Sequence, residues 1–177
     1  MRVTFERTGE RRYGVRIAID GHAPRYTHPA PGFDDHIPHD LVHYLVEAEL
    51  GLQAGVFGRA ARGGSTFLLD GEALDARARS REQRRQRKRE ASLSRRDDEG
   101  GDMARAERLA LLCDVAWRRR HGERGDAKPW LAPAPPTDDE AALVARVVER
   151  LDAVAARWHA LPVGGSLSFD WPHAQPR

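Results

Sequence analysis

The sequence has very little cysteine: Cys113 is the single thiol among 177 residues. One thiol cannot form an internal disulfide bond, and a four-cysteine zinc ribbon needs three more. Both kinds of framework are therefore excluded. Cys113 lies on the apolar face of a predicted helix, which favours a buried structural thiol over a catalytic nucleophile.

Long hydrophobic runs are absent as well. The longest apolar-rich stretch, residues 109–117, is interrupted by Asp114 and falls short of the roughly 20 residues that cross a bilayer. Residues 1–14 carry scattered charges where a secretory signal has an unbroken apolar stretch. These absences predict a soluble cytoplasmic protein that has no contact with a membrane.

Two common motifs of catalysis and nucleotide binding are also missing. The glycines between residues 55 and 64 lack the Gly-Lys-Ser/Thr ending of a phosphate-binding P-loop, so we expect ordinary turns there. No serine stands in a G-x-S-x-G nucleophile elbow. The sequence thus states no activity outright, and whether the protein is an enzyme stays open.

Charge is abundant but uneven. Charged residues make up 32% of the chain and hydrophobic residues 40%, which is typical of one soluble domain over residues 1–177 with solvated segments. Residues 77–96 contain ten Arg or Lys and two acids, a net charge of +8 within an overall +2. The remainder therefore carries −6, so the folded body is not a general nucleic-acid surface.

The periodicity of apolar residues predicts an α+β fold. Residues 2–7 and 11–20 alternate apolar and polar positions and predict a β-hairpin, and residues 65–71 and 164–172 predict two further strands. The proline-rich residues 21–38 predict an ordered loop. We expect a small antiparallel sheet made of the hairpin and the two further strands.

About three helices are expected to cover one face of this sheet. Apolar residues recur at spacings of three and four over 38–50 and 103–121. A third helix begins at a capping box over residues 137–140, in which a hydroxyl and a carboxylate satisfy each other's backbone donors, and ends before Pro162. The glycine-punctuated residues 51–64 are expected to form a short connection.

Two other stretches have too few apolar residues to pack. Residues 72–101 contain only alanines and two leucines as apolar residues, and predict a charged insertion that is either a solvated helix or disordered. Residues 127–136 are rich in proline and predict a linker within the domain.

The stretch HIPHDLVHYLVE, which begins at His36, concentrates histidines and acids in a predicted helix. His39, His43 and Glu47 follow one another at intervals of four and share one helix face, where two imidazoles can bind one zinc ion. Glu47 or His36 would be the third ligand. Asp40 stands in the place of the acid of H-E-x-x-H, as a candidate general base or a group that orients a ligand. With water in an open fourth position, this would be a metal-dependent, hydrolase-like site.

A plain amphipathic helix explains the same pattern. Its histidines would then lie at the edge of a packed face, hydrogen-bonded to the preceding loop or partly exposed, and no metal would bind. Another catalytic use of His39 and Asp40 is a third interpretation. Further polar groups above the face of His39 and His43 would favour an enzyme, and aliphatic packing over that face would favour a non-catalytic protein.

The arginine-rich insertion predicts this competing, non-catalytic function. On a helix its cations form one basic stripe, and such stripes attract phosphate backbones by releasing counterions. The stripe consists of Arg77, Arg81, Arg84, Arg85, Lys88 and Arg89. No aromatic residue is interleaved, so a stacking platform for single strands is not expected. The alternative function is an interaction protein whose basic arm, residues 77–96, binds nucleic acid or an acidic protein. The same residues are also explained by a solvated insertion that binds no partner.

Two resemblances accompany these patterns. Residues 39–43, HDLVH, resemble the H-D-x-x-H zinc motif of the Coq-type scaffold proteins of ubiquinone biosynthesis, which implies zinc here; those proteins carry a further glutamate at the position of Gly55. The blocks IPHDLVHYLVEAELGL, GVFGRAARGG and LPVGGSLSFDW resemble a family of short, uncharacterised actinobacterial proteins with the same order of blocks. That resemblance covers most of the chain apart from the charged insertion and implies no activity.

Overall fold

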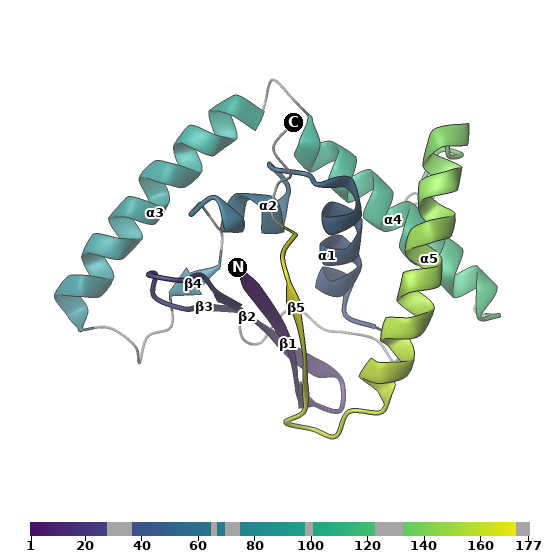
Figure 1. Ribbon diagram of the computed structural model, residues 1–177, viewed down its shortest axis with the longest axis horizontal. Coiled ribbons are helices and arrows are strands. Elements are labelled where there is room, and N and C mark those ends of the chain that lie inside the picture. The colour runs from purple at the N-terminus through teal and green to yellow at the C-terminus, as the bar shows by residue number, and fades with distance from the viewer. Residues whose placement is uncertain (28–36, 65–66, 70–74, 98–100, 123–132, 173–177) are drawn as a thin grey trace.

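The computed structural model of the protein has an α+β fold, as the sequence predicts (Figure 1). It describes residues 1–27, 37–64, 67–69, 75–97, 101–122 and 133–172. Within these ranges the chain forms one five-stranded sheet and five helices. Of the predicted linker over residues 127–136, only residues 133–136 are described, and they have no regular secondary structure. None of the described helices is long and apolar enough to cross a membrane.

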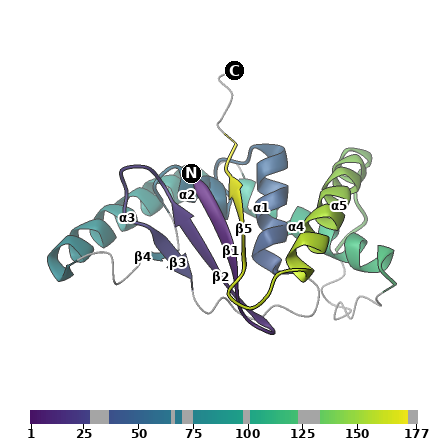
Figure 2. The same ribbon diagram turned by 60° about the horizontal axis from the view of Figure 1, so that its bottom comes forward.

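The sheet is antiparallel, with the strand order β4-β3-β2-β1-β5. Its strands are β1 (Arg2–Gly9), β2 (Arg12–Ala18), β3 (Arg25–Thr27), β4 (Leu68–Leu69) and β5 (Ser166–Asp170). β1 and β2 form the predicted hairpin, in which Val3 lies opposite Ile17. The predicted strands over 65–71 and 164–172 are confirmed as the short β4 and as β5. Because β5 pairs with β1, the last strand of the chain lies beside the first (Figure 1 and Figure 2).

The alternation of side chains gives the sheet one apolar and one polar face. Val3, Phe5 and Val15 are fully buried beneath the helices. On the opposite face of β1 and β5, the hydroxyl groups of Thr4 and Ser168 lie 2.8 Å apart and exposed. The two-residue period of the sequence therefore fixes which side of the sheet receives the helices.

The third strand corrects the predicted loop over residues 21–38. β3 pairs with β2, and residues 28–36 lie outside the described part of the chain. A strand of three residues is too short to show an alternating pattern. A long-range contact holds it instead, because the buried Arg25 guanidinium donates to the carbonyl oxygens of Gly63 and Gly64 at 3.1 and 2.9 Å.

The helices include the three that the sequence predicts. They are α1 (His39–Leu50), α2 (Val56–Ala61), α3 (Ala76–Asp97), α4 (Asp102–Arg120) and α5 (Asp138–His159). Gly51 follows α1 in the left-handed conformation, with a φ of 63°. The capping box opens α5: the Glu140 N–H donates to the Thr137 hydroxyl, and the Thr137 N–H donates to the Glu140 carboxylate at 2.8 Å. These helix ends follow the prediction because their signals are local.

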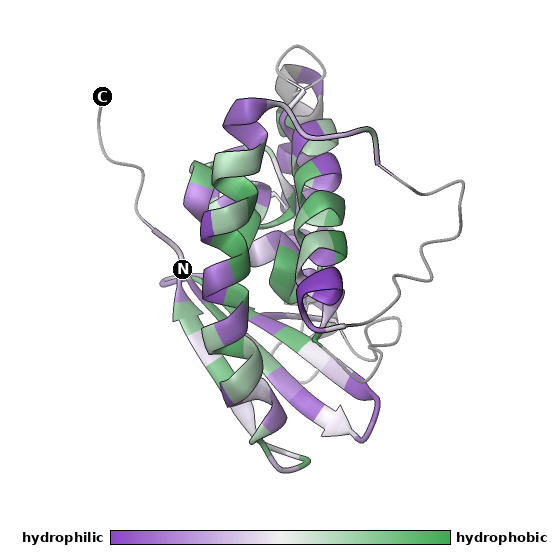
Figure 3. Cartoon of the chain, turned by 90° about the vertical axis from the view of Figure 1, so that its right-hand side faces the viewer, coloured by the Kyte–Doolittle hydropathy of each residue, from purple (hydrophilic) through white to green (hydrophobic). Residues whose placement is uncertain are grey.

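α1 is the centre of the helical layer. It lies between the sheet on one side and the pair α4 and α5 on the other (Figure 1 and Figure 2). The rings of Phe5, Tyr44, Phe57 and Phe169, from β1, α1, α2 and β5, meet with centroids 5.3 to 6.2 Å apart. α4 and α5 alternate between hydrophobic and hydrophilic residues along their length (Figure 3), and each buries one side.

α2 corrects the predicted connection over residues 51–64. Its Phe57 and Ala60 are buried, and Gly58 packs so closely that a side chain there would collide with the carbonyl oxygen of Leu52. The helix has no side-chain cap from its own N-cap residue. A six-residue helix flanked and interrupted by glycines offers too little periodicity for a sequence-based prediction.

The charged insertion is a helix, α3, with one docked face. Gln86 and Leu93 are buried. The Gln86 amide donates to the Phe67 carbonyl oxygen at 2.7 Å, and Arg59 of α2 forms an ion pair with Glu90 at 2.8 Å. The described residues form the helix of the two predicted alternatives, but its docked face corrects the expectation that this stretch does not pack. Polar side chains, which a search for apolar patterns overlooks, hold it on the domain.

Candidate metal centre

α1 brings His39 and His43 together on one face, as their four-residue spacing predicts. Their Nε2 atoms lie 3.1 Å apart, and the rings meet edge to face with centroids 4.7 Å apart. His39 is exposed, whereas His43 is only 5% exposed. The pair is therefore anchored in the domain at one end and open to solvent at the other.

The third member of the cluster is Glu107 of α4, which the sequence analysis missed. Its Oε2 atom lies 3.5 Å from His43 Nε2, and the ligand atoms of all three residues lie within 4.8 Å of one another. Glu107 follows the buried Ala106 and precedes the buried Leu109, at the edge of the apolar stripe of a helix that packs on α1. The apolar pattern of α4 indicates that Glu107 lies at the edge of a buried face, but it does not indicate that this face packs on α1.

Two of the distances in the cluster suit one zinc ion. Tetrahedral zinc binds histidine nitrogens at about 2.0 to 2.1 Å, which places two ligand atoms of the same ion about 3.3 Å apart. Two separations, 3.1 Å between the histidines and 3.5 Å from His43 to Glu107, lie on either side of this value, and the third pair lies within 4.8 Å. Because the Glu107 side chain is 59% exposed, its carboxylate can adjust without repacking of the core.

Burial keeps His43 neutral. It lowers the pKa of His43 to about 4, an effect that the nearby His39 increases and the charge of Asp40 opposes. At neutral pH the imidazole therefore has a lone pair to offer a metal. The buried Nδ1 of His43 has no hydrogen-bond partner among the described residues, whereas a metal-bound histidine usually donates its second N–H. We therefore expect weaker binding here than at a fully supported zinc site.

Glu47, one of the two predicted third ligands, is the N-terminal cap of α2 instead. Its Oε1 accepts the Val56 N–H at 2.9 Å, and its Oε2 accepts the N–H groups of Phe57 and Gly58 at 2.9 and 3.1 Å. Both oxygens of this fully buried carboxylate are thus directed to α2. The predicted ligand set is corrected accordingly, and Glu107 takes the place of Glu47 in the cluster.

The surroundings of Glu47 raise its pKa to about 7. Burial is the main cause, the three N–H groups act in the opposite direction, and the charge of Glu107 adds to the rise. Gly55 leaves room for this carboxylate, since a Cβ at that position would collide with it.

Asp40 lies beside the histidine pair but contacts the sheet. The Tyr13 hydroxyl of β2 donates to Asp40 Oδ2 at 2.9 Å, and burial together with the charge of Asp40 raises the pKa of Tyr13. This bond ties the first turn of α1 to the sheet and so positions the neighbouring His39. The role of Asp40 as general base stays a prediction. His36, the other predicted third ligand, lies outside the described residues.

The predicted basic stripe runs along α3, away from the histidine cluster on α1 and α4. All of its side chains are exposed: those of Arg77, Arg81, Arg84, Arg85, Lys88 and Arg89. The Arg89 guanidinium donates to the carbonyl oxygen of Arg62 at 3.0 Å, and the Arg85 guanidinium lies 3.9 Å from the Glu82 carboxylate. The stripe and the cluster are therefore two separate surfaces.

No family model matches the sequence, and neither a curated protein nor a solved structure matches it. The resemblances to the Coq-type motif and to the actinobacterial family accordingly stay predictions. Inference about function therefore starts from the geometry of the two surfaces.

Proposed function

We propose that the protein binds a divalent transition metal, with zinc as the first choice, through His39, His43 and Glu107. The observation that supports this most is the convergence of three ligand atoms from two helices within 4.8 Å. Two histidines and a glutamate form a donor set that zinc takes in hydrolytic enzymes. Imidazole and carboxylate ligands also suit other transition metals, which is why the proposal names a class of metal.

Three protein ligands would leave one position of a tetrahedral zinc ion to solvent. His39 and Glu107 are exposed, so water can reach that position. Zinc lowers the pKa of a bound water to about 7 and so supplies a hydroxide nucleophile near neutral pH. The activity that this proposal favours is a hydrolase-like reaction, with Asp40 as the candidate general base.

Metal content tests the proposal. The untagged protein, stripped with a chelator and dialysed against zinc, should retain about one zinc ion per chain by elemental analysis, and His39→Ala/His43→Ala should retain none. His121→Ala/His159→Ala removes two histidines elsewhere and should keep the wild-type amount. Equal zinc in the two double variants would overturn the proposal.

Glu107→Gln tests the third ligand. It should weaken zinc binding about tenfold or more in a calorimetric titration, because a ligand carboxylate is lost. Glu149→Gln removes an exposed carboxylate from α5 with the same change in charge, and should leave the affinity unchanged. An equal affinity of Glu107→Gln and wild type would exclude Glu107 from the ligand set.

The hydrolytic part of the proposal has its own test. Zinc-loaded wild type should cleave activated esters or phosphoesters faster than zinc-loaded Asp40→Asn at equal zinc content. The substitution removes the candidate general base and keeps the three zinc ligands. If wild type, Asp40→Asn and His39→Ala/His43→Ala all cleave these substrates at the same slow rate, the hydrolytic part of the proposal is wrong, and only metal binding is left.

A further inference from the structure

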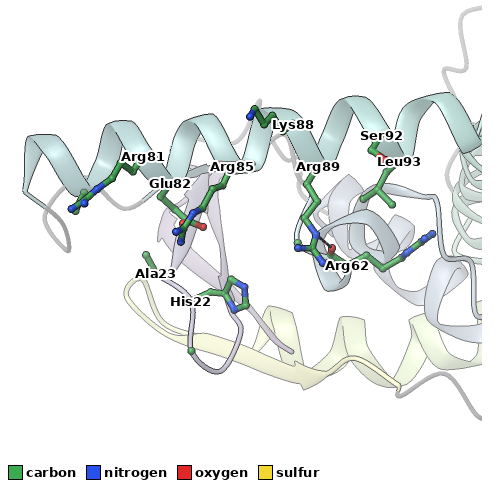
Figure 4. Close-up of a pocket in the computed structure, with 14 residues that line it drawn as sticks. His22, Ala23, Arg62, Arg81, Glu82, Arg85, Lys88, Arg89, Ser92 and Leu93 are labelled. Atoms are coloured by element: carbon green, nitrogen blue, oxygen red, sulfur yellow. Dashed lines mark hydrogen bonds and ion pairs between the residues drawn. The ribbon is translucent and has the colours of Figure 1, made fainter.

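A large open groove runs between α3 and the turn that joins β2 to β3 (Figure 4). Its volume is about 1120 Å³. α3 forms one wall, and the other is formed by His22 and Ala23 of the turn and by Arg62 and Gly63, which follow α2. None of the described residues that line the groove belongs to α1 or α4, so it is distinct from the metal centre.

The groove is strongly basic. The described residues that line it include one carboxylate, that of Glu82, and five cations: Arg62, Arg81, Arg85, Lys88 and Arg89. Figure 4 shows Glu82 and Arg85 pointing from α3 toward the turn that carries His22, while Arg62 lies beside Arg89. Cationic residues therefore line both walls of the groove, and not the helix alone.

The helix that carries most of these charges is already held in place. The Glu90 carboxylate accepts a hydrogen bond from Arg59 at 2.8 Å, and the Gln86 amide donates to a carbonyl oxygen at 2.7 Å. Leu93 is buried on the same side. α3 thus uses Glu90, Gln86 and Leu93 for docking, and the docked helix holds its arginines in a preorganised row. Preorganisation reduces the entropic cost of binding a partner.

The positive charge of the groove is poorly balanced within the protein. Arg81 and Lys88 form no ion pair with a described residue, and Arg85 has only a contact of 3.9 Å to Glu82 while its side chain is 81% exposed. Like charges held close together repel one another, and a polyanion removes that repulsion. The partner that fits the groove is therefore an extended anion.

We propose that this groove binds the phosphate backbone of duplex nucleic acid without reading the base sequence. Nine of the ten cations in residues 77–96 are arginine, whose planar fork matches phosphate oxygens better than the point charge of lysine. The stripe from Arg77 to Arg89 is about 18 Å long at the helical rise per residue. Each strand of a duplex carries about five phosphate charges over that length.

Two other polyanions fit less well. An extended acidic peptide advances about 3.3 Å per residue and turns alternate side chains away, so it offers about three carboxylates to the same length of groove. A single strand is held by stacking its bases on aromatic rings, and no Phe, Tyr or Trp is among the described lining residues. The net charge of −6 outside the arm also keeps the contact local to the groove.

The binding isotherm of a fluorescent duplex of about two helical turns, followed by anisotropy at several salt concentrations, tests the proposal. If the five lining cations each neutralise one phosphate, the slope of log affinity against log salt is about −4.5. Binding should then weaken about 500-fold between 50 and 200 mM salt. Duplexes of unrelated sequence should bind with equal affinity, and a sequence preference would contradict the proposed backbone contact.

Variants in the two walls distinguish binding by the whole groove from binding by the basic arm alone. Arg81→Gln/Arg85→Gln should weaken binding about tenfold or more and reduce the slope by about 1.8, since two phosphate contacts are lost. Arg62→Gln lies outside α3 and should reduce the slope by about 0.9, whereas a contact made by the arm alone leaves it unchanged. Arg105→Gln/Arg119→Gln, two exposed arginines of α4, is the control of equal charge and should bind like wild type.

Three outcomes would overturn the proposal. The first is equal affinity of Arg81→Gln/Arg85→Gln and its control. The second is tighter binding of labelled poly-glutamate than of the duplex at the same salt, which would assign the groove to an acidic protein. The third is equal affinity for a single strand with the same number of phosphates. Each variant should have the circular dichroism spectrum of wild type, which excludes unfolding of α3 as the cause of weaker binding. Arg62→Gln is a second control for this, because it changes no residue of α3.

Discussion

Replacement of Glu47 by glutamine should change the stability of the protein in a pH-dependent way. Glu47 is fully buried, and its pKa is raised from an ordinary 4.5 to about 7. A raised carboxyl pKa means that this group stabilises the fold fully below about pH 4.5, and that the contribution is lost as the pH rises through 7. Glutamine does not titrate, so Glu47→Gln lacks this loss.

The expected magnitude follows from the two pKa values. Between pH 5 and pH 7 the wild-type protein should lose about 2 kcal/mol of unfolding free energy at Glu47, because ionisation is progressively opposed by burial. In Glu47→Gln the amide oxygen can still accept N–H groups of α2, but its NH₂ group faces a donor, which costs about 1 to 3 kcal/mol at every pH. The variant should thus improve relative to wild type by about 2 kcal/mol over this pH range.

Urea unfolding followed by circular dichroism at pH 5 and pH 7, with a chelator present, measures this difference. His43 acts in the opposite sense, because its pKa of about 4 makes the fold lose stability as the pH falls below 6.5. This contribution is shared by variant and wild type and cancels between them. Glu149→Gln, which leaves Glu47 in place, should lose the same stability between pH 5 and pH 7 as wild type.

The opposite result would refute the reasoning. If the three N–H groups at the start of α2 outweigh burial, the pKa of Glu47 lies below its ordinary value. Wild type would then gain stability relative to Glu47→Gln as the pH rises toward 5, and it would lose none between pH 5 and pH 7. A difference that is the same at pH 5 and pH 7 would also contradict the expectation, since the pKa of Glu47 would then not be raised by folding.

Three further sets of substitutions test contacts that hold the fold together. Gly55→Ala should lower the unfolding free energy by about 1 to 3 kcal/mol in urea, because its Cβ meets the Glu47 carboxylate; an unchanged value would contradict that close contact. Thr137→Ala should cost about 1 kcal/mol by thermal unfolding through loss of the capping box, and Thr137→Ser should keep most of it. Tyr13→Phe and Asp40→Asn should each cost about 1 kcal/mol, and the double variant should lose less than their sum; strict additivity would argue against their hydrogen bond.

The parts of the fold that the sequence predicts are those with local signals. The hairpin pairs Val3 with Ile17 through an alternation visible in both strands, and the hydroxyl and carboxylate that cap α5 stand three residues apart. Similarly, the four-residue spacing of His39 and His43 is enough to place two imidazoles side by side on α1.

The parts that the sequence misses depend on contacts between distant residues. β3 is held by Arg25 reaching carbonyl groups far along the chain, and α2 is capped by the carboxylate of Glu47 on another helix. Glu107 joins the histidines only because α4 packs on α1. The second wall of the basic groove, with Arg62, is brought to α3 in the same way. The spacing of residues along the chain does not predict contacts between residues that are distant in sequence.

The most direct test of the metal centre is anomalous diffraction at the zinc absorption edge from crystals of the zinc-loaded protein. One peak is expected, at about 2.0 to 2.1 Å from the Nε2 atoms of His39 and His43 and at about 2.0 to 2.2 Å from a carboxylate oxygen of Glu107. A crystal that shows no peak at saturating zinc, or a peak coordinated by other side chains, would contradict this expectation.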